Sequence, residues 1–186
     1  MSLAIEVIRK AATDERNLLL QDSEWRNAFL GAEPKEPLLV WGKDGAEDYF
    51  IVQFRQGNRT TAILLIDPQT GEVDAVTGIQ KTGESMYLFL QPEEVPAALQ
   101  RYKARRSSDD FRPIEREDLP RLPADIRPET ISVVELYWEA CDQSLTPFQP
   151  LYRVEQPRSD GSGKDTFYVR VDGELFPAIT HAGMGM

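Results

Sequence analysis

The residue types that most often carry catalysis are scarce in this sequence. It contains one histidine, His181, close to the C-terminal end, and one cysteine, Cys141, inside the apolar stretch VVELYWEACDQ. A Ser–His or Cys–His pair needs an imidazole held in an ordered site, and a chain end holds side chains poorly. Free cysteines usually pack as small buried apolar groups. We therefore predict no nucleophilic catalysis and a buried Cys141.

Ligands for a metal ion are equally scarce. Zinc and iron sites normally use several histidines and cysteines, and this chain has one of each. Two acidic stretches that contain glycine, DPQTGEVD at 67–74 and SDGSGKD at 159–165, come nearest to a calcium loop. Gln69 and Gly71 occupy ligand positions in the first stretch, and Lys164 interrupts the second. We predict hairpin turns at both, and neither a metal nor a cofactor.

Motifs for phosphate binding and hydrolysis do not occur in the sequence. The fragment GSGK at 161–164 lacks the preceding glycine and the following Ser or Thr of a phosphate-binding loop. Glu135 and Glu139, four residues apart, would lie on one face of a helix, where they are most simply solvated charge. The missing catalytic set predicts that the protein is not an enzyme.

The charge balance argues against two classes of partner. The 186 residues include 31 acidic and 21 basic side chains, for a net charge of −10. Such a surface repels phosphate backbones and anionic lipids, so we predict no nucleic-acid partner and no membrane partner. The basic run RYKARR at 101–106 is expected to be the cationic end of a helix. The chain as given shows no signal peptide and no long apolar span, which predicts a cytoplasmic protein.

Apolar periodicity predicts two α+β units separated by a connector. The first unit covers 1–106 and the second covers 129–186, while 107–128 is rich in proline and charge and reads as an extended connector. The first unit is expected to contain helices at 2–12 and 92–106 and strands at 48–54, 60–66, 72–79 and 85–90. The second is expected to contain a helix at 129–143 and strands at 151–156, 166–171 and 174–179.

The two halves share one order of elements. In each, a helix is followed by a strand, a polar turn, a strand, a tight turn that contains aspartate, and a further strand. We therefore predict an α+β fold of two αβββ repeats. Each repeat is an antiparallel sheet packed against a helix, and the sheets are either separate or merged into one.

This plan resembles the PepSY module and its cystatin-like relatives. The resembling residues are YFIV at 49–52 and IDPQTGEV at 66–73 in the first half, and YRV at 152–154 and VDGEL at 171–175 in the second. PepSY modules are associated with the inhibition or regulation of peptidases and occur mostly outside the cytoplasm, whereas this chain shows no export signal. The resemblance implies a cystatin-like fold and an inhibitory or regulatory role.

The preferred function is therefore that of an acidic, non-enzymatic module that binds a protein, either a basic enzyme or a peptidase. Trp41 precedes a glycine-containing loop and is the expected exposed anchor, because loop aromatics often bind partners. One alternative is a small-ligand pocket, or an uncharacterised enzyme, between helix and sheet around Trp41, Tyr49 and Tyr152. A second alternative is a structural subunit that associates with itself as a homodimer.

Overall fold

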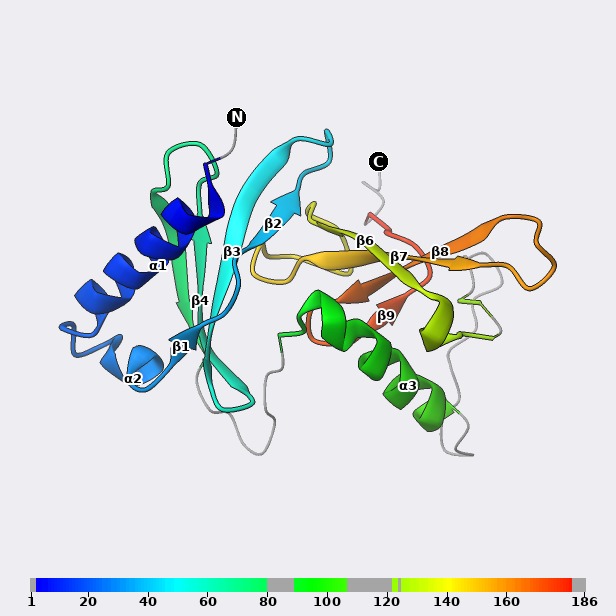
Figure 1. Ribbon diagram of the computed structural model, residues 1–186, viewed down its shortest axis with the longest axis horizontal. Coiled ribbons are helices and arrows are strands. Elements are labelled where there is room, and N and C mark those ends of the chain that lie inside the picture. The colour runs from blue at the N-terminus through cyan, green and yellow to red at the C-terminus, as the bar shows by residue number, and fades with distance from the viewer. Residues whose placement is uncertain (1–2, 80–88, 107–121, 124, 182–186) are drawn as a thin grey trace, which may run out of the picture. The chain divides into compact units, whose positions relative to one another are not determined.

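The computed structural model describes residues 3–79, 89–106, 122–123 and 125–181. This part of the chain is α+β, as predicted, with a mixed and mostly antiparallel sheet and few helices (Figure 1). The chain divides into two compact units, one made of Met1–Phe89 with Leu136–Glu139 and the other of Leu90–Glu135 with Ala140–Met186. None of the described helices is both long enough and apolar enough to cross a membrane.

The first unit is a helix-covered antiparallel meander. Its elements are α1 (Ile5–Leu19), α2 (Arg26–Phe29), β1 (Glu33–Pro34), β2 (Leu38–Trp41), β3 (Glu47–Gln56), β4 (Arg59–Ile66) and β5 (Val73–Gly78). Strands β2 to β5 pair antiparallel in sequence order, and β1 pairs with β3. The strands expected at 48–54, 60–66 and 72–79 are therefore present. The strand expected at 85–90 lies mostly outside the described residues.

Helices α1 and α2 cover one face of this sheet. Alternate residues of β3 and β4 point to that face, and they pack with Ile8 and Ala12 of α1 and with Phe29 of α2. The ring of Phe29 meets the ring of Phe54 edge-on, with 5.0 Å between the ring centroids. This cluster fixes α2 against the β3–β4 hairpin.

The turn between β4 and β5 has the predicted chemistry. Gly71 takes a positive φ of 75°, which glycine adopts without steric cost. The carboxylate of Asp67 accepts hydrogen bonds from the backbone N–H groups of Gln69 and Thr70, at 2.7 and 2.6 Å. These two bonds hold the pKa of Asp67 below its ordinary value.

The second unit also combines a helix with antiparallel strands. Its elements are η1 (Pro92–Glu94), α3 (Val95–Arg106), η2 (Pro128–Thr130), β6 (Ser132–Tyr137), β7 (Leu151–Pro157), β8 (Lys164–Arg170) and β9 (Leu175–Phe176). Strands β7, β8 and β9 pair antiparallel in sequence order. The last two residues of β6 belong to the first unit, where they pair parallel with β2. Helix α3 thus belongs to the second unit, whereas its place before the connector led us to expect it in the first.

The helix predicted at 129–143 is wrong, because Ser132–Tyr137 forms strand β6. The segment contains Ile131, Val133 and Val134, whose β-branched side chains lose rotamer freedom in a helix and pack well on a sheet. Exposure alternates along the first four residues of β6, which is the pattern of a strand with one covered face. The predicted burial of Cys141 is confirmed.

Buried polar side chains tie the chain around α3 to the strands of this unit. The hydroxyl of Tyr152 on β7 donates to the carbonyl oxygen of Leu90 at 2.7 Å, and the N–H of Leu90 donates to Val171 at 2.6 Å. The buried amide of Gln156 accepts from the N–H of Arg127 and donates to the carbonyl of Asp125. The bonds of Gln156 anchor the C-terminal end of the segment predicted as a connector, and those of Leu90 hold the chain ahead of α3. Most of the predicted connector lies outside the described residues.

We predict that Asp67→Asn makes folding less sensitive to acid. The folded pKa of Asp67 lies below its unfolded value of about 3.9. Its contribution to stability is therefore complete above the unfolded pKa and is lost as the pH falls through the folded pKa. Urea titrations between about pH 5 and pH 2 should show a shallower loss of the free energy of unfolding in the variant than in the wild type.

Asp74→Asn is the matched control, because Asp74 is an exposed carboxylate on β5 of the same hairpin. It removes the same charge without touching the turn. Parallel pH profiles for the wild type and Asp67→Asn would contradict the proposed role of the two turn hydrogen bonds.

Candidate functional site

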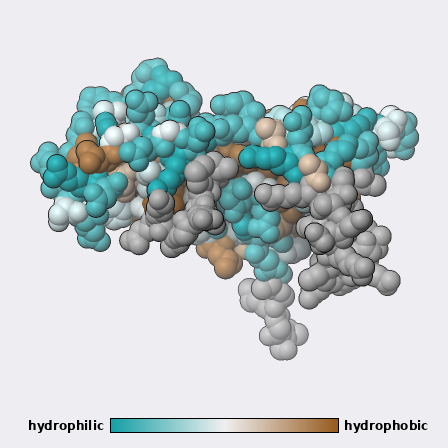
Figure 2. Space-filling model, turned by 90° about the horizontal axis from the view of Figure 1, so that it is seen from below, coloured by the Kyte–Doolittle hydropathy of each residue, from teal (hydrophilic) through white to brown (hydrophobic). Residues whose placement is uncertain are grey.

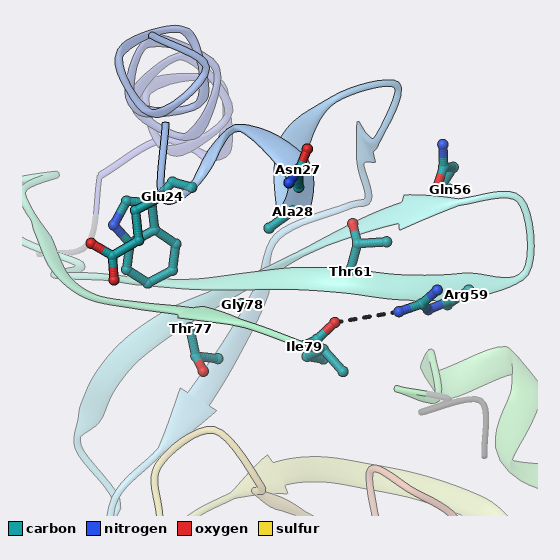
Figure 3. Close-up of a pocket in the computed structure, with 10 residues that line it drawn as sticks. Glu24, Asn27, Ala28, Gln56, Arg59, Thr61, Thr77, Gly78 and Ile79 are labelled. Atoms are coloured by element: carbon teal, nitrogen blue, oxygen red, sulfur yellow. Dashed lines mark hydrogen bonds between the residues drawn. The ribbon is translucent and has the colours of Figure 1, made fainter. Parts of the chain in front are cut away.

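The first unit contains an open pocket of about 610 Å³ (Figure 3). Its walls come from the α1–α2 connection, from α2, from the β3–β4 turn and from the end of β5. The lining residues are Glu24, Trp25, Asn27, Ala28, Gln56, Arg59, Thr61, Thr77, Gly78 and Ile79. Most of these side chains are polar, so the pocket suits a polar ligand better than a lipid.

Gly78 brings α2 close to strand β5 on one side of the pocket. A Cβ atom on Gly78 would lie 3.5 Å from the Cβ of Ala28 and 3.5 Å from Cζ3 of Trp25. The half-buried Trp25 ring therefore sits directly against the backbone of β5. Because Trp25 immediately precedes α2, its ring is positioned by the packing of α2 on the sheet.

The pocket carries opposite charges at its two ends, Glu24 at one and Arg59 at the other (Figure 3). Arg59 follows the tight turn at Gly57, where φ is 61°, and begins β4. Its Nη2 donates to the carbonyl oxygen of Ile79 over 3.5 Å, which is at the outer limit for a hydrogen bond. The N–H of Glu24 donates to the carboxylate of Asp22, which holds this residue in a local turn.

The arrangement supports binding more directly than chemistry. Threonines and amides between the two charges offer hydroxyl and N–H donors together with acceptors. Among the described residues, no group of three His, Cys, Asp or Glu side chains gathers as metal ligands. Sequence reasoning missed this pocket, since nothing in the spacing of Trp25 and Arg59 shows that α2 folds onto the end of β5.

Two of the three residues singled out in the sequence lie on neighbouring strands of the first unit. Trp41 ends β2 and is half-buried, and its carbonyl oxygen accepts from the N–H of Trp138 at 2.9 Å. Tyr49 on β3 is 6% exposed and meets Trp138 edge-on, with 6.4 Å between the ring centroids. Burial, with the charge of Asp48, raises the pKa of Tyr49, so its hydroxyl stays protonated.

The third residue, Tyr152, is a core residue of the second unit. It is 1% exposed, and its hydroxyl is bound to the carbonyl oxygen of Leu90. Tyr49 and Tyr152 thus serve the interiors of two different units. Of the three residues, Trp41 alone is partly exposed.

The second unit presents a different kind of feature, a loop from Cys141 to Pro150 that carries the exposed Leu145. This leucine is 82% exposed. Next to it, the buried hydroxyl of Ser144 reaches two carbonyl oxygens of the same loop, 2.6 Å from that of Gln149 and 3.2 Å from that of Thr146. The backbones of Cys141 and Ser144 also exchange two hydrogen bonds of 3.1 Å. The loop is therefore internally braced around an apolar tip.

The base of this loop is also held by hydrogen bonds. The guanidinium of Arg170 donates to the carbonyl oxygen of Gln143 at 2.9 Å and pairs with the carboxylates of Asp172 and Glu174. The amide of Gln143 donates to the hydroxyl of Thr180 and accepts from its backbone N–H. No sequence signal marks this loop, because a lone leucine between polar residues forms no pattern.

Comparisons with known proteins assign no role to the pocket or to the Leu145 loop. No family model, no curated protein and no solved structure matches the chain. The roles of the pocket and of the Leu145 loop therefore rest on the contacts described above.

We predict that the size of the side chain at position 78 controls the ring of Trp25. In Gly78→Ala the new Cβ would meet its neighbours at an ordinary contact distance of 3.5 Å. That variant should gain up to about 1 kcal/mol in unfolding free energy, because glycine loses more backbone freedom on folding than alanine does. Gly78→Leu should displace the ring, lower stability by about 1–3 kcal/mol and shift the tryptophan fluorescence.

Placing Gly78→Leu in a Trp25→Phe background assigns the fluorescence change. The shift should vanish there, because the reporting indole is gone. A shift of the same size in that background would show that another tryptophan responds and would contradict the proposed contact.

Proposed function

We propose that the protein is a non-enzymatic module that binds another protein through the Leu145 loop of its second unit. The observation that carries this proposal is a large apolar side chain that is 82% exposed at the tip of a loop braced by hydrogen bonds. An exposed leucine on its own is ordinary. The hydrogen bonds that hold the loop are what make the exposure of Leu145 significant.

A braced loop binds at a lower entropic cost than a loose one. Ordering a flexible loop or side chain on binding consumes part of the interaction free energy. Here Ser144 and Gln143 already hold the backbone on both sides of the tip, and Arg170 holds its base. Leu145 is thus presented as a preformed anchor for an apolar pocket on the partner.

The charge of the chain supports a basic partner. The net charge is −10, and opposite charge speeds encounter and adds salt-sensitive attraction. Asp142, within the Leu145 loop, is exposed. A basic enzyme or a peptidase with a cationic rim around an apolar pocket is the partner class that fits.

We further propose that both units follow one cystatin-like or PepSY-like plan. In the first unit α1 precedes the meander β2–β5, and in the second α3 precedes β6–β9. The packing of α1 on one face of its antiparallel sheet supports this relation. In this view α3 takes the place of the helix that the sequence predicted at 129–143.

We predict that Leu145→Asp abolishes capture of the partner. The immobilised wild-type protein should retain one basic protein from an extract of the cells that express it, at low salt and less at moderate salt, because attraction between opposite charges is screened. Leu145→Asp puts a charge where the partner offers an apolar pocket, and it should lose that protein. Mass spectrometry of the bound fraction is the measurement.

Leu18→Asp is the matched control, since Leu18 is 62% exposed on α1 of the first unit and lies on no braced loop. It should capture the partner like the wild type. Equal capture by all three proteins, or no specific capture, would contradict the proposal. A wild-type dimer in solution that becomes a monomer in Leu145→Asp would instead support the self-associating alternative.

A further inference from the structure

We infer that the pocket of the first unit binds a short peptide with free termini, with its ammonium group at Glu24 and its carboxylate at Arg59. The pocket is a separate site from the Leu145 loop, which lies in the other unit. The inference therefore does not depend on the proposed protein partner.

The two end charges are the first argument. Glu24 is exposed and makes no ion pair with a described residue. The guanidinium of Arg59 makes one long bond of 3.5 Å within the described structure, so most of its five N–H donors remain for a ligand. Figure 3 shows these two residues at opposite ends of the pocket, which matches a ligand with opposite charges at its two ends.

The middle of the pocket is the second argument. Trp25 and Ala28 line the pocket and provide an apolar surface for a side chain. The amide of Asn27 and the hydroxyls of Thr61 and Thr77 can serve the N–H and C=O groups of peptide bonds. A volume of about 610 Å³ falls within the range of small-molecule sites.

The same features disfavour other small ligands. A nucleotide or another polyanion would meet one cation, Arg59, among the described lining residues, and the carboxylate of Glu24 would repel it. A fatty acid would leave the polar groups of the lining without partners, which costs free energy. A zwitterionic peptide with an apolar central side chain matches the charges at both ends of the pocket and the apolar surface between them.

The test is isothermal titration calorimetry of the full chain with the tripeptides Ala-Leu-Ala and Ala-Phe-Ala. Each is compared with its N-acetylated form and with its C-amidated form. In the wild type, each blocking group should weaken binding about tenfold, the usual scale for one charged hydrogen bond. Binding that is absent for both peptides, or equal for free and blocked forms, would overturn the inference.

Variants assign each end of the ligand to its residue. Glu24→Gln should weaken binding of the free peptide. In this variant N-acetylation should no longer change the affinity, whereas C-amidation should still lower it. Arg59→Gln should show the reverse. A variant that keeps both effects at wild-type size would overturn the assignment of its end.

The matched controls are Glu33→Gln on β1 and Arg26→Gln on α2. Both residues are exposed in the same unit, and neither lines the pocket. They change the same charges and should bind like the wild type. Leu145→Asp should also bind the peptides with unchanged affinity, so failure of the loop proposal and failure of this one give different results.

Discussion

The first unit depends on covering the apolar face of β3 and β4. Alternate residues of these strands need a cover, and α1 and α2 supply it around the edge-on pair of Phe29 and Phe54. The same contact carries α2 toward the end of β5, where Gly78 lets Trp25 approach the backbone. The pocket thus exists because a short helix must lie over the sheet. Its polar lining comes from residues at the margins of the core.

The second unit depends on hydrogen bonds that its buried polar side chains make to the backbone. Tyr152 bonds the backbone of Leu90 ahead of α3, and Gln156 bonds the backbone of Asp125 and Arg127 ahead of β6. Unpaired buried polar groups are costly, so these bonds hold both backbone segments in definite places. Ser144 plays the same part in the Leu145 loop, where its one buried O–H lies within hydrogen-bond distance of two carbonyl oxygens. Figure 2 shows that hydrophilic residues make up much of the described surface on one face, with a few hydrophobic residues among them.

The turns and the longest strands could be predicted from the sequence, because their causes are local. The turn from Asp67 to Gly71 follows from proline, glycine and an aspartate that bonds its own backbone. The helix that we predicted at 129–143 was wrong, because aromatic and apolar residues at mixed spacing fit a buried helix as well as a strand. Pairing with neighbouring strands decided that case in favour of β6.

The sequence by itself determined the α+β class, the net charge of −10, the β-rich runs at 48–54, 60–66 and 72–79 and the burial of Cys141. These depend on composition, periodicity and turn chemistry, which act over a few residues. The tertiary structure alone decided that Glu24 and Arg59 line one pocket and that Leu145 stands at a braced tip. These residues are far from their partners along the chain or carry no pattern of their own, so their roles arise when packing and hydrogen bonding bring separate segments together.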